Sequence, residues 1–188
     1  MKSITFLRNI KGLSQRNLAR QAGISFRSVQ LLESDRHDPQ ISTLQKVASA
    51  IGYPVHAVQG CLNRFFYQPP ESIAIISEWI LEEGEESWRG WIPQFVDTFR
   101  KKRDPRYIEE MPASKTAPKI KALLASTVEA LCAELELPPP DWIEMVVPLT
   151  EPWFVSGVES LKASALVESP VFFRKRNIFV LGNFLDRV

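Results

Sequence analysis

Apolar residues recur at helical spacing through the first sixty residues and predict a series of short helices. Ile4, Leu7 and Ile10 lie three residues apart, so they share one face of a first helix, which stops at Gly12. Further helices are expected over residues 15–22, 26–33 and 41–51, followed by a short helical turn over 55–62. Their ends carry residues that favour caps and turns, namely Ser14, Gly23, Ser25 and Gly52.

Beyond residue 62 the pattern predicts a second, mostly helical region. Helices are expected over residues 71–83, 117–136 and 156–167, and another helical segment over 95–99, after an interruption at Pro93. Three consecutive prolines at 138–140 predict an extended link. Residues 141–149 suit a short helix or a strand, and 171–180 are ambiguous. The predicted fold class is mainly α, with domains at residues 1–62 and 63–188.

Charge is distributed unevenly between these two regions. Residues 1–60 contain eight Lys and Arg against three Asp and Glu, a net charge of +5 in a chain whose total is +1. A basic head on a mildly acidic body fits a DNA-binding domain joined to a domain with another role. Cys61 and Cys132 lack metal or redox spacing, and no apolar stretch suits a signal peptide or a membrane span. The expected location is the cytoplasm.

The stretch from Leu13 to Glu33 has the pattern of two capped helices joined by a glycine turn. Ala19 in the first helix allows the second helix to cross close to it, and Leu18, Ile24 and Val29 can form a small shared core. On a basic domain, this arrangement places the second helix in the major groove of DNA.

From Ile4 to about Val58 the sequence resembles the Cro/C1-type helix-turn-helix family, also called the XRE family. The resemblance is carried by the order and spacing of Arg8, Gly12 to Gln15, Leu18-Ala19, Gly23 to Ser25, Ser28-Val29, Leu32-Glu33, Pro39, Leu44 and Ala48 to Gly52. It implies a five-helix domain that binds an operator in double-stranded DNA, most often as a homodimer. The chain is therefore interpreted as a sequence-specific transcriptional repressor.

The resemblance also assigns roles to individual residues. Arg8 and Glu33 are expected to form a structural ion pair between the first and third helices. DNA contacts are expected from Gln15, Ser25, Phe26, Arg27, Ser28, Gln30, Leu31, Arg36 and His37.

Several of these contacts have two interpretations. Arg27 suits a guanine edge or a phosphate, and Gln30 suits an adenine or the flank of the helix. Phe26 and Leu31 suit a thymine methyl or the protein interior. These two apolar positions leave open whether the recognition helix reads bases directly.

No catalytic constellation, metal site or cofactor site is predicted. Both histidines, His37 and His56, fall in the basic region, so none lies beyond it to act as a base or a ligand. There is no glycine-rich phosphate loop and no Cys/His metal spacing. The chain is not expected to be an enzyme.

The role of the second region has three interpretations. Residues 152–154, 161–162, 168–170 and 173–180 resemble, loosely, C-terminal regions of regulators from toxin–antitoxin operons, which implies an autoregulating antitoxin that holds a toxin protein. A ligand-controlled regulator is the second interpretation, because all five tryptophans lie here and could enclose a small molecule: Trp79, Trp88, Trp91, Trp142 and Trp153. The third is a protein-interaction adaptor whose helix-turn-helix no longer reads DNA.

Overall fold

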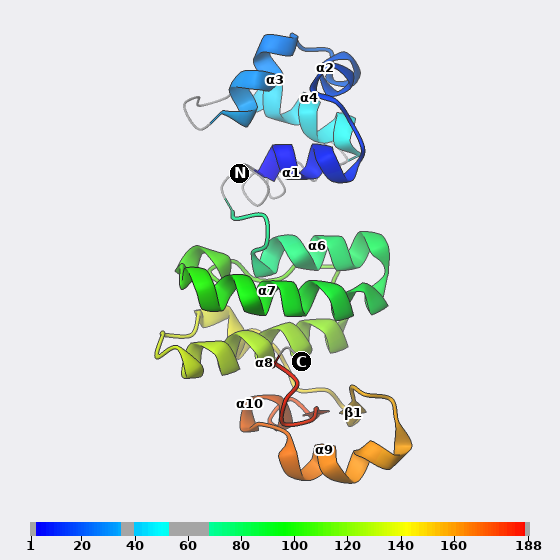
Figure 1. Ribbon diagram of the computed structural model, residues 1–188, viewed down its shortest axis with the longest axis vertical. Coiled ribbons are helices and arrows are strands. Elements are labelled where there is room, and N and C mark those ends of the chain that lie inside the picture. Colours follow the sequence, from blue (N-terminus) through cyan, green and yellow to red (C-terminus); the bar gives the residue numbers. More distant parts are fainter. Residues whose placement is uncertain (1–2, 35–39, 53–67, 187–188) are drawn as a thin grey trace. The chain divides into compact units, whose positions relative to one another are not determined.

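The chain folds into two compact units, which span Met1–Pro70 and Glu71–Val188 (Figure 1). The computed structural model describes residues 3–34, 40–52 and 68–186. The helical turn expected over 55–62 and the expected domain boundary at residue 62 lie outside the described residues. Within the described residues the fold is mainly α, as predicted.

Four described helices form unit 1: α1 (Ser3–Ile10), α2 (Gln15–Ala22), α3 (Phe26–Glu33) and α4 (Ile41–Ile51). Helix α2 contacts both α3 and α4, and α1 contacts α3. Most of each apolar stripe predicted from the sequence faces inward, with Ile41 as an exception at 56% exposed, and these members are almost fully buried: Ile4, Leu7, Leu18, Val29, Leu32, Leu44, Val47 and Ile51.

The ends of these helices follow from local chemistry. The Ser14 and Ser25 hydroxyls each accept a hydrogen bond from a backbone N–H three residues later, which caps α2 and α3. Gly23 and Gly52 end α2 and α4 with positive φ angles of 60° and 104°, a conformation that glycine adopts without steric cost. Helix α4 differs from α2 and α3, because it starts at Ile41 after Gln40, which makes no side-chain cap.

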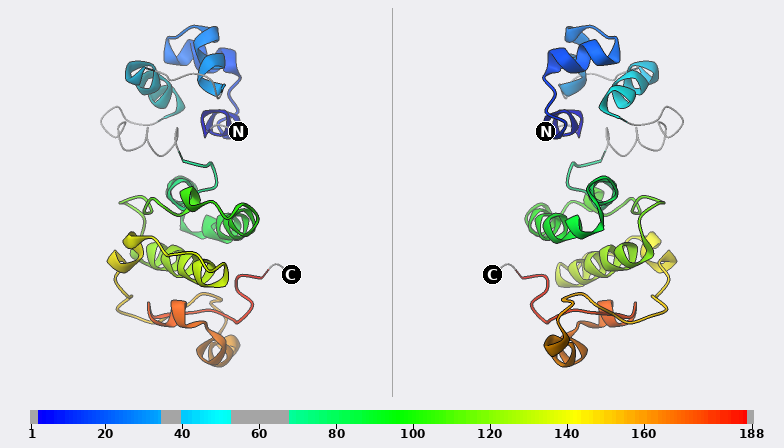
Figure 2. Two further views of the ribbon diagram at one scale, coloured as in Figure 1. Left: turned by 90° about the vertical axis from the view of Figure 1, so that its left-hand side faces the viewer. Right: turned by 90° about the vertical axis from the view of Figure 1, so that its right-hand side faces the viewer.

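Unit 2 is built on three helices that pack side by side: α6 (Ile73–Glu83), α7 (Trp88–Lys102) and α8 (Pro118–Glu134). Figure 2 shows them from two further sides. Short 3-10 turns flank them, at Glu85–Ser87 (η2) and Pro105–Tyr107 (η3). Their facing sides form one hydrophobic core, in which Ile76, Phe95, Phe99, Leu124 and Val128 are buried.

The expected interruption at Pro93 is wrong, because α7 continues through it. The proline removes one backbone hydrogen bond, the one that residue 93 would donate to the carbonyl of Arg89. Trp88, Ile92, Val96 and Phe99 lie four, four and three residues apart and are all buried on one face. Burial of four large side chains at about 1.5–3 kcal/mol each outweighs the proline penalty of about 3 kcal/mol.

The last third of the chain folds back on α8. It comprises the 3-10 helix η4 (Asp141–Met145), the strand β1 (Trp153–Phe154), η5 (Glu159–Leu161), α9 (Lys162–Glu168), α10 (Val171–Arg174) and the strand β2 (Ile178–Phe179). The two strands pair in parallel, with Trp153 opposite Ile178. Residues 138–140 form no regular element, as predicted for three consecutive prolines.

Two expectations for this part need correction. The helix expected over 156–167 begins later, because Ser156 and Gly157 lie in a turn and α9 starts at Lys162. The ambiguous segment 171–180 is two elements, since one helical turn ends at Arg174 and β2 begins at Ile178. Asn177 between them has a positive φ of 60°, which asparagine tolerates better than most residues.

A buried ion pair ties the residues that follow α10 to α8. The Arg176 guanidinium, with 4% of its side chain exposed, donates to Glu129 at 2.7 Å and to the carbonyls of Phe172 and Ile143. Lys175 also contacts the Glu129 carboxylate. The network closes the C-terminal segments onto the three-helix core.

Candidate nucleic-acid interface

Helices α2 and α3 are joined by a three-residue turn whose backbone is held by hydrogen bonds. The N–H groups of Gly23 and Ile24 both donate to the last turn of α2, and Ile24 bonds the carbonyl of Ala19 at 3.1 Å. Ser25, two residues after Gly23, then caps α3. Ala19 is 5% exposed and contributes only a methyl group, which permits the close contact between the two helices. The turn therefore sets the direction of α3 relative to α2.

An ion pair locks α3 to α1, as expected for Arg8 and Glu33. The Arg8 Nε donates to Glu33 at 2.6 Å, and a second guanidinium nitrogen donates to the other carboxylate oxygen at 3.2 Å. The two side chains are only 13% and 7% exposed. The third nitrogen of Arg8 donates to the carbonyl of Leu13 at 2.8 Å. One guanidinium thus joins α1, the turn before α2, and the end of α3.

Gln15 completes this lock from the first position of α2. Its side-chain amide donates to Glu33 Oε2 at 2.8 Å, so that Glu33 receives hydrogen bonds from both α1 and α2. Burial alone would raise the pKa of Glu33, but hydrogen bonds from Arg8 and Gln15 and the charge of Arg8 outweigh it, and the pKa lies below its ordinary value of 4.5. Glu33 is therefore a charged structural group at neutral pH.

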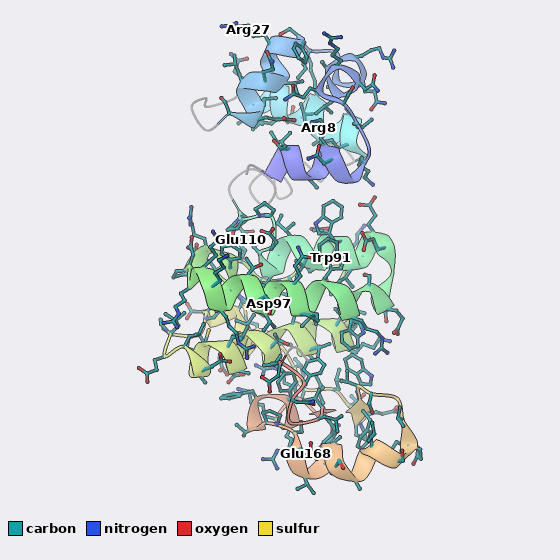
Figure 3. The ribbon with its side chains drawn as sticks, in the orientation of Figure 1. Arg8, Arg27, Trp91, Asp97, Glu110 and Glu168 are labelled. Atoms are coloured by element: carbon teal, nitrogen blue, oxygen red, sulfur yellow. The ribbon has the colours of Figure 1, made fainter. Side chains whose placement is uncertain are left out.

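The opposite side of α3 is exposed. Val29 and Leu32 are buried at 0% and 2%, whereas Phe26 and Leu31 are 39% and 38% exposed and Arg27 and Gln30 are also exposed. In Figure 3, Arg27 reaches outward from α3, whereas Arg8 lies between α1 and the other helices of its unit. The helix therefore presents two apolar and two polar side chains, and neither Arg27 nor Gln30 is used by the fold of the described residues.

Arg16 extends this surface from α2, a contribution that sequence reasoning missed. Its guanidinium lies over the Phe26 ring, 5.7 Å from the ring centroid. This distance is within the range of a cation–π contact. The signal in the sequence was a cation near the start of one helix and an aromatic residue at the start of the next.

The exposed charges in the described residues of unit 1 are positive. Among the described residues of unit 1, Lys11, Arg16, Arg20, Arg27 and Lys46 are exposed cations. Glu33 is the one carboxylate in residues 3–34 and 40–52, and it faces Arg8 inside the domain. Among these described residues the exposed charge is thus of one sign, which favours binding to a polyanion.

The structure distributes the predicted contact residues unevenly. Phe26, Arg27, Gln30 and Leu31 lie together on α3, with Ser25 and Ser28 at its first turn. The two serine hydroxyls are 2.8 Å apart, and Ser25 also accepts from the Ser28 N–H. Gln15 is turned to Glu33, and Arg36 and His37 lie outside the described residues. DNA contact by any of these residues stays a prediction.

In unit 2 most of the aromatic residues form the core. Trp79, Trp88 and Trp142 are buried, and Trp91 and Trp153 are partly buried. Trp91 stacks against Trp79 with ring centroids 6.1 Å apart. One pocket of about 170 Å³ lies between α7 and the C-terminal segment, lined by Trp88, Ile92, Pro93, Val96, Asp97, Phe184, Leu185 and Asp186. Only one of the five tryptophans faces it.

No group of His, Cys, Asp and Glu side chains within the described residues could hold a metal ion. In the same part of the chain, no helix is long and apolar enough to cross a membrane.

Comparison with known proteins identifies unit 1 alone. Residues 5–57 match a family described as helix-turn-helix, a stretch that covers less than a third of the chain. No curated protein and no solved structure matches the chain. Residues 5–57 are therefore a helix-turn-helix domain of the type predicted, and such a domain indicates a DNA-binding regulator.

Proposed function

We propose that the chain is a sequence-specific transcriptional repressor that places α3 in the major groove of double-stranded DNA. The observation that carries the proposal is the exposed face of α3, where Arg27 and Gln30 are exposed beside two apolar side chains. A helix held in place at both ends by the Ser25 cap and the Glu33 lock suits this task, because base reading needs a rigid helix.

In this proposal the side chains of α3 divide the work of recognition. Arg27 donates two hydrogen bonds to the O6 and N7 atoms of a guanine, and Gln30 pairs with an adenine. Arg16 and Arg20 on α2 are exposed at the flank of this face and neutralise phosphates. Gln15 acts through its bond to Glu33, which orients α2 against α3.

We further propose that the protein binds as a homodimer in the cytoplasm and blocks transcription by occupying its operator. Two copies of α3 would meet successive major grooves, roughly 34 Å apart, so the operator would be a two-fold site. The proposed role is one of binding, without a chemical step.

The test is binding of the full-length chain to duplex DNA taken from upstream of its own gene, measured by fluorescence anisotropy. Arg27→Ala should weaken specific binding by about 1–3 kcal/mol, with the loss confined to one base position of each half-site. Arg174→Ala is the matched control, since Arg174 is an exposed arginine of unit 2. A promoter–reporter fusion should be repressed by the wild type and released by Arg27→Ala.

Salt dependence gives a second measurement. Binding through phosphates releases counterions, so the affinity should fall steeply as the salt concentration rises. Binding that is equal for the upstream DNA and for a scrambled duplex would remove the claim of sequence specificity. Equal affinities of the wild type and Arg27→Ala on every duplex would remove the assigned role of Arg27.

A second proposed role, as an antitoxin, has support in unit 2. The segments that resemble antitoxin regulators pack against one another: β1 pairs with β2, and Ser169 bonds both Ile178 and Val180. Apolar side chains remain exposed at this end of the chain, with Leu166 at 49%, Val167 at 82% and Val171 at 56%. A toxin protein bound there would cover side chains that the fold leaves in water.

The antitoxin role can be tested with the protein encoded by the neighbouring reading frame. Co-expression and affinity capture of the full-length chain should recover it as a stoichiometric partner. Val167→Asp should abolish capture, while Val147→Asp, an exposed valine at 78% outside α9 and α10, should not. Capture that survives Val167→Asp and Val171→Asp would contradict this assignment of the surface.

A further inference from the structure

Phe26 and Leu31 are exposed apolar side chains that the core of unit 1 does not use. Val29 and Leu32 fill the core side of α3, so the inward face is complete without them. Among the side chains of unit 1 whose burial the structure describes, which exclude Phe6 and Ile10, Ile41 is the one other large apolar side chain that is exposed. Two of these three exposed apolar groups therefore lie on the helix proposed to enter the major groove.

Arg16 gives the Phe26 ring a defined position. A guanidinium 5.7 Å from the centroid restrains the ring from the side of α2, while 39% of the residue stays exposed. Arg16 also brings a positive charge beside the ring. The exposed part of the Phe26 ring is thus an apolar surface beside positive charges. Such a surface fits a ligand that carries apolar groups flanked by negative charges.

In the major groove of DNA, the C5 methyl group of a pyrimidine is the apolar point on a base edge. Thymine carries it on every A·T pair, and 5-methylcytosine carries it in methylated DNA. Phosphates on both sides of the groove supply the negative charge that Arg16, Arg20 and Arg27 complement. The other groups on a base edge in that groove are hydrogen-bond donors and acceptors, which the side chains of Phe26 and Leu31 cannot pair with.

We infer that Phe26 and Leu31 read pyrimidine C5 methyl groups in the operator, with Arg16 as the positioning residue for Phe26. The inference rests on the proposed function, because it requires α3 to lie in the major groove. The two side chains are five residues apart, about 7.5 Å along the helix axis. A helix that lies along the groove spans roughly two base-pair steps of 3.4 Å over that distance. The two methyl contacts should therefore fall on different base pairs.

The test starts from duplexes that the full-length chain selects from a random library. The selected site is then rebuilt with uracil in place of thymine, one position at a time, which deletes a single methyl group and leaves the hydrogen-bonding edge intact. Loss of one buried methyl should weaken binding about fourfold. Two positions in each half-site should show this loss, one for each side chain.

Variants assign the positions. Phe26→Ala should make binding insensitive to uracil at one of the two positions and leave the other sensitive, and Leu31→Ala should do the reverse. Arg16→Gln should weaken the methyl effect at the Phe26 position only. Ile41→Ala is the matched control, and it should keep both positions sensitive. Circular dichroism melts verify that each variant is folded.

The two sources of the methyl group are separated by the base that carries it. Duplexes with 5-methylcytosine in place of cytosine are measured beside the uracil series. A fourfold gain at a cytosine, abolished by Phe26→Ala or Leu31→Ala, identifies methylated cytosine as the source. A loss with uracil alone identifies thymine.

Two further outcomes overturn the inference, and they can be told apart. Tight binding to the selected DNA that responds to neither uracil nor 5-methylcytosine rejects methyl reading and leaves the proposed function standing. A library from which no duplex is enriched rejects both.

Discussion

Replacement of Glu33 by glutamine should remove most of the stability of unit 1 while leaving unit 2 intact. The carboxylate accepts two hydrogen bonds from Arg8 and one from Gln15. An amide has one oxygen and presents its NH₂ group to one of these donors, so at least one bond is lost. Arg8, with 13% of its side chain exposed, also loses its counter-charge.

The size of the effect follows from the burial of the pair. Breaking a buried ion pair costs about 3–5 kcal/mol, and the partial exposure of Arg8 places the expectation near 3 kcal/mol. A domain of this size has a total stability of about 3–5 kcal/mol. In the Glu33→Gln variant, unit 1 should therefore have a free energy of unfolding close to zero, even without denaturant.

Urea titrations followed by two probes separate the two units. All five tryptophans follow residue 70, so tryptophan fluorescence reports on unit 2, whereas far-ultraviolet circular dichroism reports on the helices of both. For Glu33→Gln, part of the helical signal should be lost at lower urea, with the fluorescence midpoint unchanged. Glu159→Gln is the control, because Glu159 is 86% exposed in its pair with Lys162. If Glu33→Gln costs less than about 1 kcal/mol, the pair contributes no more than a surface pair, and the assignment of a lock is refuted.

Three further predictions concern single groups. The pKa of Glu33 is lowered by folding, so its contribution to stability should be complete above about pH 4.5 and should be lost as the pH falls through the lowered pKa; a gap between wild type and Glu33→Gln that does not narrow at any pH below 4.5 would contradict this. Burial raises the pKa of the Cys132 thiol to about 11, so in a Cys61→Ser background a thiol reagent at neutral pH should react only as fast as the chain unfolds, and rapid labelling of the folded chain would count against it. Glu129→Gln should destabilise unit 2 by about 3 kcal/mol in the fluorescence transition, because it leaves the buried Arg176 unpaired; equal midpoints would exclude that role.

The helices of unit 1 could be predicted almost residue by residue because their ends are determined locally. Ser14 and Ser25 cap with their own side chains, and Gly23 and Gly52 supply the left-handed residue that ends a helix. None of these signals depends on a distant part of the chain. The sequence pattern was therefore sufficient for the four described helices of this unit.

The wrong or ambiguous predictions in unit 2 concern segments whose secondary structure is determined by tertiary packing or by pairing with a distant strand. Pro93 is a strong local signal against a helix, and it is overridden by the buried row from Trp88 to Phe99. The pairing of Trp153 with Ile178 joins residues that are far apart in sequence, each in a strand of two residues. So short a strand leaves no alternation to detect, which is why residues 171–180 were ambiguous.

The exposed residues of α3 could be predicted from the sequence, whereas the part played by Arg16 and the contacts between side chains could not. The pattern placed Phe26, Arg27, Gln30 and Leu31 on one helix, and all four are exposed there. The pattern could not show that Gln15 bonds Glu33, or that Arg16 lies over Phe26, because both contacts depend on the crossing of α2 and α3. Side-chain direction across two helices is a property of their packing.

Glu33 links the stability of the domain to the sign of its surface. A carboxylate on the exposed face of α3 would repel phosphate, whereas Glu33 lies at the inner end of the helix and its charge is compensated by Arg8. Within the described residues, the domain thus uses its one acidic group to hold α3, the proposed recognition helix, and leaves cations on the outside. This division implies that variants of the buried pair and variants of the exposed cations should differ in their effect on stability. Glu33→Gln should lower the stability of the domain and DNA binding together, whereas Arg27→Ala should lower DNA binding at unchanged stability.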